Sequence, residues 1–313
     1  MTDKKSKFTY MKVFITGING FVGQNLQPYL EGYFDIQGIS RKGKRDSFTY
    51  EMFFKENRSY DAIIHLAGKA HDLQGTSNDK DYYDVNYELT KQLYNQFLQS
   101  KAEKFIYISS VKAVADTVEG VLTEEAVPNP VTAYGKSKLM AENYILDHLP
   151  ADKKVYILRP CMIHGPGNKG NLNLLHGIVT KGIPYPLGSF KNVRSFLSIE
   201  NLCFVINELL VQKDIPSGVY QVADDLSLST NKVIELIGDS LGTKSRIWNV
   251  PSTWVTMAAR LGNHLRLPLN THRLQKLTES YVVGNAKIKL AMGKQLPVNI
   301  EEGLLKTFRS FAP

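Results

Sequence analysis

The chain has 313 residues, of which 43% are hydrophobic and 22% charged, which is enough material for one large or two modest globular domains. The formal net charge of +8 does not by itself indicate a nucleic-acid binder, because the basic residues are mostly scattered and no nucleic-acid reading element stands out. No apolar run approaches the roughly 18–20 residues that a membrane span needs.

The two cysteines, Cys161 and Cys203, lie far apart in apolar contexts. This placement favours buried free thiols over a disulfide or a metal pair, and we expect no metal site and a reducing, cytoplasmic location. The first ten residues, MTDKKSKFTY, contain basic residues but no apolar signal core, and we expect a loose tail at 1–10.

Short apolar runs alternate with longer segments of helical period along the first half of the chain. They predict strands at about 11–16, 34–40, 61–66, 104–109 and 154–159, with helices at about 20–30, 78–100 and 134–148. The strands are almost continuously hydrophobic, as expected where helices cover both faces of a parallel sheet. The pattern predicts an α/β fold of the Rossmann type, a doubly wound parallel sheet.

The regular alternation of predicted strands and helices ends after Pro160. A glycine- and asparagine-rich loop follows, and then shorter segments of mixed helix and strand. Helices are expected near 171–181, at about 198–212, from a cap at Ser229 or Thr230 to Gly242, and at the end of the chain. We expect the Rossmann domain at 11–165, with the helix at about 198–212 returning to it, and a second domain mainly at 166–313.

Three glycines at 17, 20 and 23 follow the first predicted strand in the stretch TGINGFVG. Glycine inside a regular element costs about 0.5–1 kcal/mol relative to alanine, so the stretch needs a special turn or a ligand close to the backbone. Between a strand and a helix, such a turn can hold a pyrophosphate at the helix N-terminus. The spacing alone leaves dinucleotide binding and simple packing both open.

Tyr134 and Lys138 lie four residues apart at the start of a predicted helix, and therefore on one helical face. A lysine ammonium one turn away is expected to lower the pKa of the phenol and make it a usable acid or base. Ser110, at the carboxyl end of the fourth predicted strand, is placed to hydrogen-bond the same reacting oxygen, with Ser109 as the alternative. A surface helix with an incidental tyrosine and lysine is the competing interpretation.

These elements in this order resemble the extended short-chain dehydrogenase/reductase family, also described as NAD-dependent epimerases/dehydratases, in its nucleotide-sugar branch. The resemblance extends from residue 11 to about 312 and is carried by TGINGFVG, HLAG at 65–68, SS at 109–110, Tyr134 with Lys138, RP at 159–160, GPG at 165–167 and RSFLSIENL at 194–202. It implies a Rossmann domain that binds NAD or NADP and a smaller mixed α/β C-terminal domain that holds a nucleoside diphosphate sugar.

The resemblance also implies roles for individual residues. The catalytic residues are Ser110, Tyr134 and Lys138. The cofactor contacts are Gly17, Asn19, Gly20, Phe21, Val22, Gly23, Ser40, Arg41, Lys42, Leu66, Ala67, Gly68, Tyr134, Lys138 and Pro160. The substrate contacts are Lys69, Asn86, Lys112, Asn171, Arg194 and, as a weaker candidate, Arg273.

The end of the second predicted strand departs from the pattern of NAD-selective members, which carry an acidic residue there. This chain has Ser40-Arg41-Lys42, a hydroxyl followed by two cations, which suits the 2′-phosphate of NADP. We therefore expect NADP(H) in preference to NAD(H). The alternative is that Arg41 and Lys42 only solvate a loop.

Two further departures bear on the reaction. Nucleotide-sugar dehydratases carry an Asp-Glu pair where this chain has Val111-Lys112, which argues against dehydration. The segment SSVKAVAD stands in place of the VYG ending that is common among 4-epimerases. Together with PGNKGN and PLGSFKNVRSFLSIENL, it is most similar to bacterial reductases of UDP-4-keto-6-deoxy-N-acetylhexosamines, which complete precursors of surface polysaccharides. A UDP-sugar 4-epimerase and, more remotely, a non-catalytic dinucleotide-sensing Rossmann protein are the alternatives. The resemblance implies a UDP-linked substrate and a homodimer formed through the helices at about 78–100 and 134–148.

Overall fold

The computed structural model describes residues 10–43, 47–56, 58–69, 78–265 and 270–311, so the predicted tail at 1–10 falls, apart from Tyr10, outside the described residues. The chain divides into two compact units. Unit 1 consists of Met1–Asp116, Val127–Arg159 and Cys203–Tyr220, and unit 2 of Thr117–Ala126, Pro160–Leu202 and Gln221–Pro313.

A seven-stranded sheet forms the centre of the fold, with the strand order β10-β7-β5-β4-β1-β2-β3. Its strands are β1 (Lys12–Thr16), β2 (Asp35–Ser40), β3 (Ser47–Thr49), β4 (Ala62–His65), β5 (Lys104–Ile108), β7 (Lys154–Pro160) and β10 (Gly218–Val222). The pairs from β3 through β7 are all parallel. The chain order reverses at β1 and β4, and a doubly wound sheet binds its ligands at the carboxyl edge of such a point.

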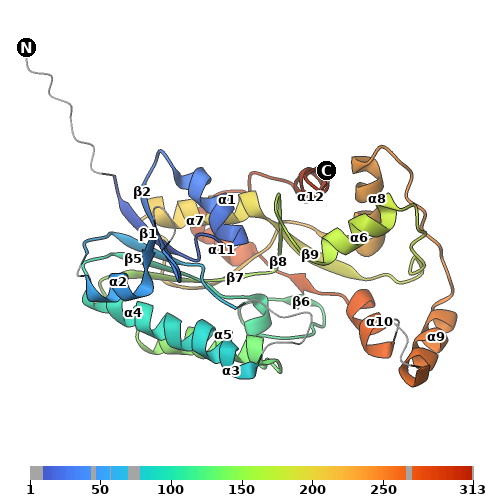
Figure 1. Cartoon of the computed structure of the whole chain (residues 1–313), viewed down its shortest axis with the longest axis horizontal. Coiled ribbons are helices and arrows are strands. Elements are labelled where there is room, and N and C mark those ends of the chain that lie inside the picture. Colours follow the sequence, from blue (N-terminus) through green and yellow to red (C-terminus); the bar gives the residue numbers. More distant parts are fainter. Residues whose placement is uncertain (1–9, 44–46, 57, 70–77, 266–269, 312–313) are drawn as a thin grey trace, which may run out of the picture. The chain divides into compact units, whose positions relative to one another are not determined.

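Helices lie on both faces of this sheet, with α1 and α7 on one face and α4 and α5 on the other (Figure 1). The helical elements here are α1 (Phe21–Leu30), α2 (Tyr50–Lys55), α3 (Asp79–Tyr83), the π-helical turn η1 (Asp84–Glu88), α4 (Leu89–Gln99), the 3-10 turn η2 (Val111–Ala113), α5 (Ala133–Asp147) and α7 (Ile199–Val211). The prediction of a Rossmann-type α/β fold is confirmed. The single helix expected at 78–100 is the run α3-η1-α4.

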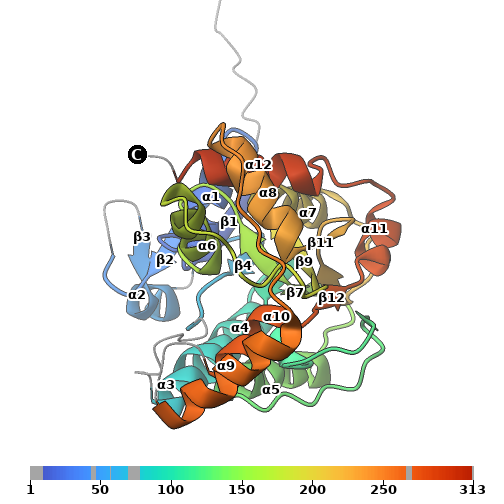
Figure 2. The ribbon, with the colours of Figure 1, turned by 90° about the vertical axis from the view of Figure 1, so that its right-hand side faces the viewer.

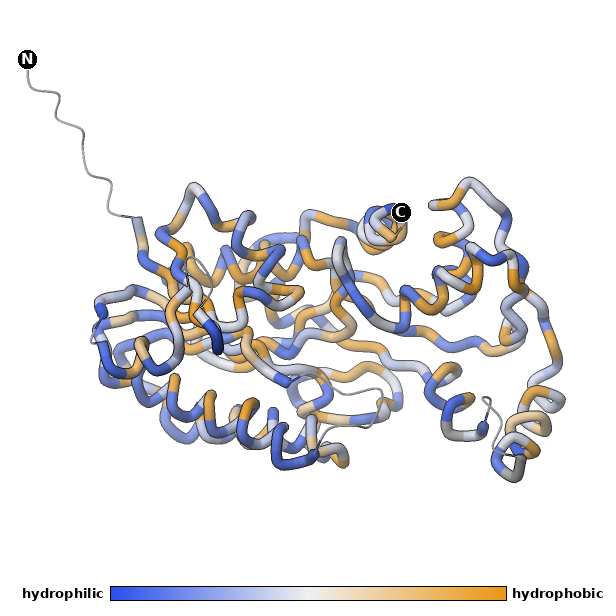
Figure 3. The backbone as a smooth tube through the Cα atoms, viewed as in Figure 1, coloured by the Kyte–Doolittle hydropathy of each residue, from blue (hydrophilic) through white to orange (hydrophobic). Residues whose placement is uncertain are grey.

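The sheet owes its stability to strands that are apolar on both faces. Every residue of β4 and β5 is buried, and Figure 3 shows the hydrophobic colour along these central strands. Aromatic rings from α4 cover the sheet, where Tyr94 meets Phe105 with ring centroids 5.1 Å apart in an edge-to-face arrangement. Burial of this kind contributes about 25 cal/mol for each Å² of apolar surface removed from water.

Unit 2 is built from small sheets and helices. Its strands are β6 (Val121–Leu122), β8 (Met162–His164), β9 (Val193–Ser198), β11 (Ser227–Ser229) and β12 (Val282–Val283). Its helices are α6 (Asn171–Thr180), α8 (Thr230–Ser240), α9 (Ser252–Leu265), α10 (Thr271–Thr278), α11 (Ala286–Met292) and α12 (Ile300–Arg309). Strand β9 lies between β8 and β11, and β6 pairs with β12.

Helices α8 and α12 run side by side in unit 2 (Figure 2), and their apolar faces share one core that includes Ile237, Leu304 and Phe308. The Ser229 hydroxyl accepts a hydrogen bond from the Lys232 N–H and caps α8. Of the two capping residues that the sequence offered, Ser229 is therefore the cap.

Within the described part of the chain, no helix combines the length and the apolar character that crossing a bilayer requires. Cys161 and Cys203 are both buried free thiols.

Candidate active site

The glycine turn between β1 and α1 is packed so closely that side chains do not fit. Gly17 has φ +70°, and a Cβ there would lie 2.7 Å from the backbone nitrogen of Ala67. A Cβ on Gly23 would lie 2.4 Å from the carbonyl oxygen of Ile18. Gly20 is the N-cap of α1 and has no side chain to cover the first N–H groups of the helix, which start at Phe21 and Val22. A helix start of this kind attracts anions.

The segment Leu66-Ala67-Gly68 follows β4 and lies directly against this turn. The Ala67 N–H donates a hydrogen bond of 3.1 Å to the Thr16 hydroxyl at the end of β1. The glycine turn and the HLAG segment are therefore two walls of one region at the carboxyl edge of the sheet. Asn19 is exposed beside them.

The end of β2 lies at the same edge, since the Gly17 N–H donates to the Ile39 carbonyl at 3.2 Å. Ser40 and Ser47 share a hydroxyl–hydroxyl hydrogen bond of 2.9 Å, and Arg41 and Lys42 follow with exposed side chains. Burial raises the pKa of Tyr50 to about 12, while a hydrogen bond to Thr16 and the positive charge of Arg41 act in the opposite direction. Tyr50 therefore hydrogen-bonds Thr16, the last residue of β1, and interacts electrostatically with Arg41.

Ser110 and Tyr134 lie together, with a hydrogen bond between their side chains. Burial raises the pKa of the Tyr134 phenol above its usual value, and the hydrogen bond to Ser110 acts in the opposite direction. The expected lowering of this pKa by Lys138 is wrong for this arrangement, because desolvation outweighs the other influences. The alternative serine, Ser109, instead donates its hydroxyl hydrogen to the Glu142 carboxylate.

The Lys138 ammonium is almost fully buried next to the HLAG segment. It donates a hydrogen bond of 2.8 Å to the Ile108 carbonyl at the end of β5 and lies 4.8 Å from the centroid of the Tyr107 ring. A Cβ on Gly68 would lie 3.0 Å from the Lys138 nitrogen and 3.1 Å from Asn86 Oδ1, so these two side chains would have to shift to admit it. Burial lowers the pKa of Lys138 to about 8, and the Glu142 carboxylate opposes this shift.

Asn86 lies in the π-helical turn η1, a feature that is frequent at functional sites. Its side-chain oxygen accepts from the Lys69 N–H at 2.8 Å, and its side-chain nitrogen donates to the Ser137 hydroxyl at 3.1 Å. The Lys69 ammonium forms an ion pair with Asp81 at 2.6 Å. Asn86 therefore joins the residue after the HLAG segment to helix α5.

A buried histidine extends this polar chain. Thr90 donates its hydroxyl hydrogen to the Asn86 carbonyl, so it must accept from His65 Nε2, and His65 Nδ1 then accepts from Thr16. Burial and the charge of Lys138 lower the pKa of His65 to about 3, so the ring is neutral. This series of hydrogen bonds connects the end of β1 with the turn that carries Asn86.

Lys112 directly follows the Ser110 turn. Its backbone N–H donates to the Ser110 hydroxyl at 3.2 Å, and its ammonium donates to the Asp116 carbonyl at 2.7 Å. The lysine thus stabilises the turn after β5 in addition to any contact with a substrate.

The remaining predicted residues, Pro160, Asn171, Arg194 and Arg273, belong to unit 2. Asn171 is exposed at the first position of α6, Arg273 is exposed on α10, and Pro160 is the last residue of β7. Arg194 donates from Nε to the Glu279 carbonyl at 3.1 Å and also to the Lys276 carbonyl. Its guanidinium is therefore partly engaged with the backbone at the C-terminal end of α10.

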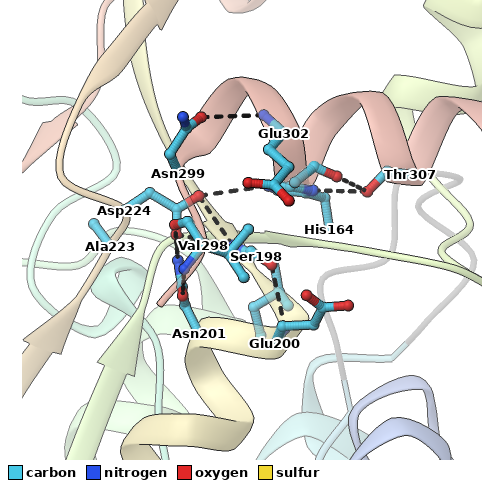
Figure 4. Close-up of polar contacts among 12 residues, drawn as sticks. His164, Ser198, Glu200, Asn201, Ala223, Asp224, Val298, Asn299, Glu302 and Thr307 are labelled. Carbon is cyan, nitrogen blue, oxygen red and sulfur yellow. Dashed lines mark hydrogen bonds and ion pairs between the residues drawn. The ribbon is translucent and has the colours of Figure 1, made fainter. Parts of the chain in front are cut away.

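A buried polar cluster joins β8, the end of β9 and α12 in unit 2 (Figure 4). The Asp224 carboxylate accepts from the Ser198 N–H at 3.1 Å and from the Asn201 side chain at 2.7 Å. His164 lies 3.6 Å from Asp224 and makes a 2.9 Å hydrogen bond with Thr307. The cluster fixes the strand that leads into the glycine-rich loop before α6.

Glu142 was not singled out from the sequence, and Arg159 only as part of the RP motif, yet their side chains form a buried ion pair between α5 and β7. Arg159 donates to Glu142 through Nε at 3.0 Å and through a terminal nitrogen at 2.5 Å. The sequence feature that could have indicated Glu142 is its position four residues after Lys138, one turn along the same helix. In the described ranges, no group of three or more His, Cys, Asp or Glu side chains is placed to hold a metal ion.

Comparison with known proteins identifies the family of the chain. The model of the NAD dependent epimerase/dehydratase family matches residues 13–223. The chain is 28% identical to a UDP-glucose 4-epimerase of Vibrio cholerae, with 96% of this chain and 95% of the relative aligned. It is 26% identical to a GDP-6-deoxy-D-mannose reductase of Pseudomonas aeruginosa, over 82% of this chain and 89% of the relative.

A solved structure described as RMD from Pseudomonas aeruginosa complexed with NADPH has the same fold, with a TM-score of 0.70 at 21% identity, covering 96% of this chain and 98% of that one. The family model covers more than half of the chain, and the relatives align along most of it. The chain therefore belongs to the NAD dependent epimerase/dehydratase family.

Proposed function

We propose that this chain is an NADP(H)-dependent reductase of a nucleotide-linked 4-keto-6-deoxy sugar, of the UDP-N-acetylhexosamine type, that acts in the cytoplasm in the synthesis of surface polysaccharide precursors. The observation that carries the proposal is the Ser110–Tyr134 hydrogen bond at the sheet edge where the Lys138 ammonium is buried. Unit 1 is the cofactor domain in this proposal, and unit 2 holds the nucleotide sugar.

The residues of unit 1 fit a dinucleotide. A Cβ on Gly17 or Gly23 would meet backbone within 2.7 Å, so the turn keeps the chain tight around the uncovered start of α1, where a pyrophosphate binds. Lys138 holds the nicotinamide ribose hydroxyls, and Arg41 and Lys42 take the 2′-phosphate. The bound cofactor supplies the hydride for C4 of the sugar.

The protein's own residues supply the proton. Tyr134 is protonated at neutral pH, since the usual pKa of a phenol is near 10 and burial raises it further, and it donates its proton to the C4 oxygen. Ser110 hydrogen-bonds the same oxygen, and the positive charge of Lys138 stabilises the tyrosinate that remains. Hydride at C4 and a proton on the oxygen together give the alcohol.

Incubation with NADPH and a panel of 4-keto nucleotide sugars tests the reaction. We expect a mass gain of two hydrogens in a UDP-linked 4-keto-6-deoxy-N-acetylhexosamine, with oxidation of a matching amount of NADPH. A panel without any such gain would contradict the proposal.

A UDP-sugar 4-epimerase is the second candidate, favoured by the 28% identity to the Vibrio cholerae UDP-glucose 4-epimerase along almost the whole chain. An epimerase keeps its NAD tightly bound, whereas a reductase exchanges NADP(H). NAD that copurifies with the chain, together with inversion at C4 of UDP-glucose or UDP-N-acetylglucosamine, would decide for the epimerase.

The homodimer stays a prediction, which light scattering of the purified chain tests.

The cofactor preference gives a separate prediction. Arg41→Ala should weaken NADPH binding by about tenfold or more, since a hydrogen bond to a charged group contributes about 1.5–3 kcal/mol, and should leave NADH binding unchanged. Fluorescence titration with both reduced cofactors measures this. Lys55→Ala is the matched control, because Lys55 is an exposed cation of the same unit that pairs with Glu51 at 2.7 Å. Tighter binding of NADH than NADPH by the unmodified chain would overturn the preference.

A further inference from the structure

Three elements of unit 1 meet at one buried carboxylate, that of Glu142 on α5. Its exposed fraction is 0% and that of Arg159 on β7 is 4%. Arg159 Nε lies 3.1 and 3.0 Å from the two carboxylate oxygens, and a terminal nitrogen lies 2.5 Å from Oε2. Ser109, which directly follows β5, donates its hydroxyl hydrogen to Oε1.

Stability alone is a weak reason for such a pair. Removing two charges from water is expensive, and a well-packed apolar pair of similar volume is often equally stable or more so. The ion pair instead fixes the orientation of the Glu142 side chain, because a guanidinium fork and a hydroxyl hold the carboxylate in one position. A carboxylate of fixed orientation is useful where α5 must be placed accurately against the sheet. It has no advantage over apolar side chains where the core only has to be filled.

Glu142 and its partner Ser109 both adjoin residues of the proposed reaction. Ser109 precedes Ser110 in the chain, and Glu142 lies one helical turn after Lys138 and two turns after Tyr134 on the same face of α5. The Lys138 nitrogen is itself tied to the carbonyl of Ile108, the last residue of β5. The ion pair therefore sets how α5 is placed against the ends of β5 and β7.

We propose that Glu142 is a positioning residue, which holds Tyr134 and Lys138 against Ser110 and keeps a negative charge one turn from the Lys138 ammonium. This role rests on the proposed use of Lys138 in cofactor binding, but not on the identity of the sugar. Arg159 and Ser109 act through Glu142 and fix its orientation.

The electrostatic surroundings of Lys138 support the second half of this role. From β4 it faces the neutral His65, from β5 the Tyr107 ring and the Ile108 carbonyl, and along α5 the Glu142 carboxylate, while Tyr134 lies one helical turn before it in the chain. The positive charge of Arg159 is paired with Glu142. Burial lowers the pKa of Lys138, and the Glu142 carboxylate is the charge that raises it.

The test is the pH dependence of NADPH binding to the full chain, measured by fluorescence titration between about pH 6.5 and 9.5. In the unmodified chain the affinity should fall as Lys138 loses its proton. Glu142→Gln removes the opposing charge, so Lys138 loses its proton at lower pH. We expect the midpoint of the fall to move down by on the order of one pH unit.

Lys104→Met is the matched control. Lys104 is also buried, its pKa is also lowered to about 8, and it donates to the carbonyls of Leu209 and Leu210 at 2.9 and 2.7 Å. It lies at the opposite end of β5 from Ser109, so its removal should lower thermal stability without moving the midpoint. A Glu142→Gln variant that keeps the midpoint of the unmodified chain would overturn the proposal.

Glu142→Gln leaves Arg159 buried without its counter-charge and could prevent folding. The double variant Glu142→Leu, Arg159→Met replaces the pair by apolar side chains and removes that difficulty. A folded double variant with a lowered midpoint supports the proposal, and one with an unchanged midpoint overturns it. Because no sugar enters this experiment, a failed search for a 4-keto substrate would count against the proposed function and not against Glu142.

Discussion

Replacing Tyr134 by phenylalanine should lower kcat by a factor on the order of 10²–10⁴, which is the usual contribution of a positioned general acid. The phenol is the proton donor in the proposed reaction, and its hydrogen bond to Ser110 places it at the reacting oxygen. The change removes one oxygen atom and keeps the ring, so the edge-to-face contact with Tyr82, at 6.2 Å between centroids, is retained. Cofactor affinity should change little, since the glycine turn and Lys138 are untouched.

The measurement is the steady-state rate of NADPH oxidation with the 4-keto sugar that the panel identifies. Tyr144→Phe is a suitable control on the same helix, where the phenol donates a 2.7 Å hydrogen bond to the Asn95 side chain. That variant should lose some stability and keep its kcat. Turnover of Tyr134→Phe at the rate of the unmodified chain would remove Tyr134 from the mechanism and leave the cofactor site in place.

The central sheet was predictable because its elements are encoded locally. Strands such as Ala62–His65 and Lys104–Ile108 are buried on both faces, so their apolar runs carry the signal without help from distant residues. The helix α5 was predictable in the same way, from its period. Pairings between distant short segments have no such signal: β6 and β12 have two residues each and lie about 160 residues apart in the sequence. Only the folded chain brings them together.

Spacing located Tyr134 and Lys138 on one helical face, yet it could not indicate how deeply either is buried. Burial is what raises the pKa of Tyr134 and lowers that of Lys138, so the predicted direction for the tyrosine was wrong. The same limit applies to Arg194, whose guanidinium donates to backbone carbonyls at the C-terminal end of α10, a contact between residues about 80 positions apart. The partner of a charged side chain is a property of the fold.

The glycine turn gives the prediction with the largest effect on cofactor binding. Gly23→Ala should weaken NADPH binding by about 100-fold or more, because the displaced N–H groups of Phe21 and Val22 would each lose a hydrogen bond to a charged phosphate, which contributes about 1.5–3 kcal/mol. The new Cβ would lie 2.4 Å from the Ile18 oxygen and 2.5 Å from its Cα, and these are backbone atoms that cannot rotate away. Helix α1 must therefore move, together with the N–H groups at its start. Overpacking of this kind also costs about 1–3 kcal/mol of stability.

Gly32→Ala separates the effect of this contact from ordinary backbone strain. Gly32 has φ +91°, and a Cβ there has open space, so the variant should lose about 1–2 kcal/mol through the left-handed conformation alone and keep its affinity for NADPH. Gly17→Ala combines both effects, with φ +70° and a contact of 2.7 Å to the Ala67 nitrogen. Thermal denaturation measures the stability of the three variants, and fluorescence titration measures their affinity for NADPH. We expect the affinity to fall as the contact of the new Cβ becomes closer, from Gly32→Ala through Gly17→Ala to Gly23→Ala. If Gly23→Ala binds NADPH as tightly as Gly32→Ala, the close approach of α1 to the turn exists for packing and not for the pyrophosphate.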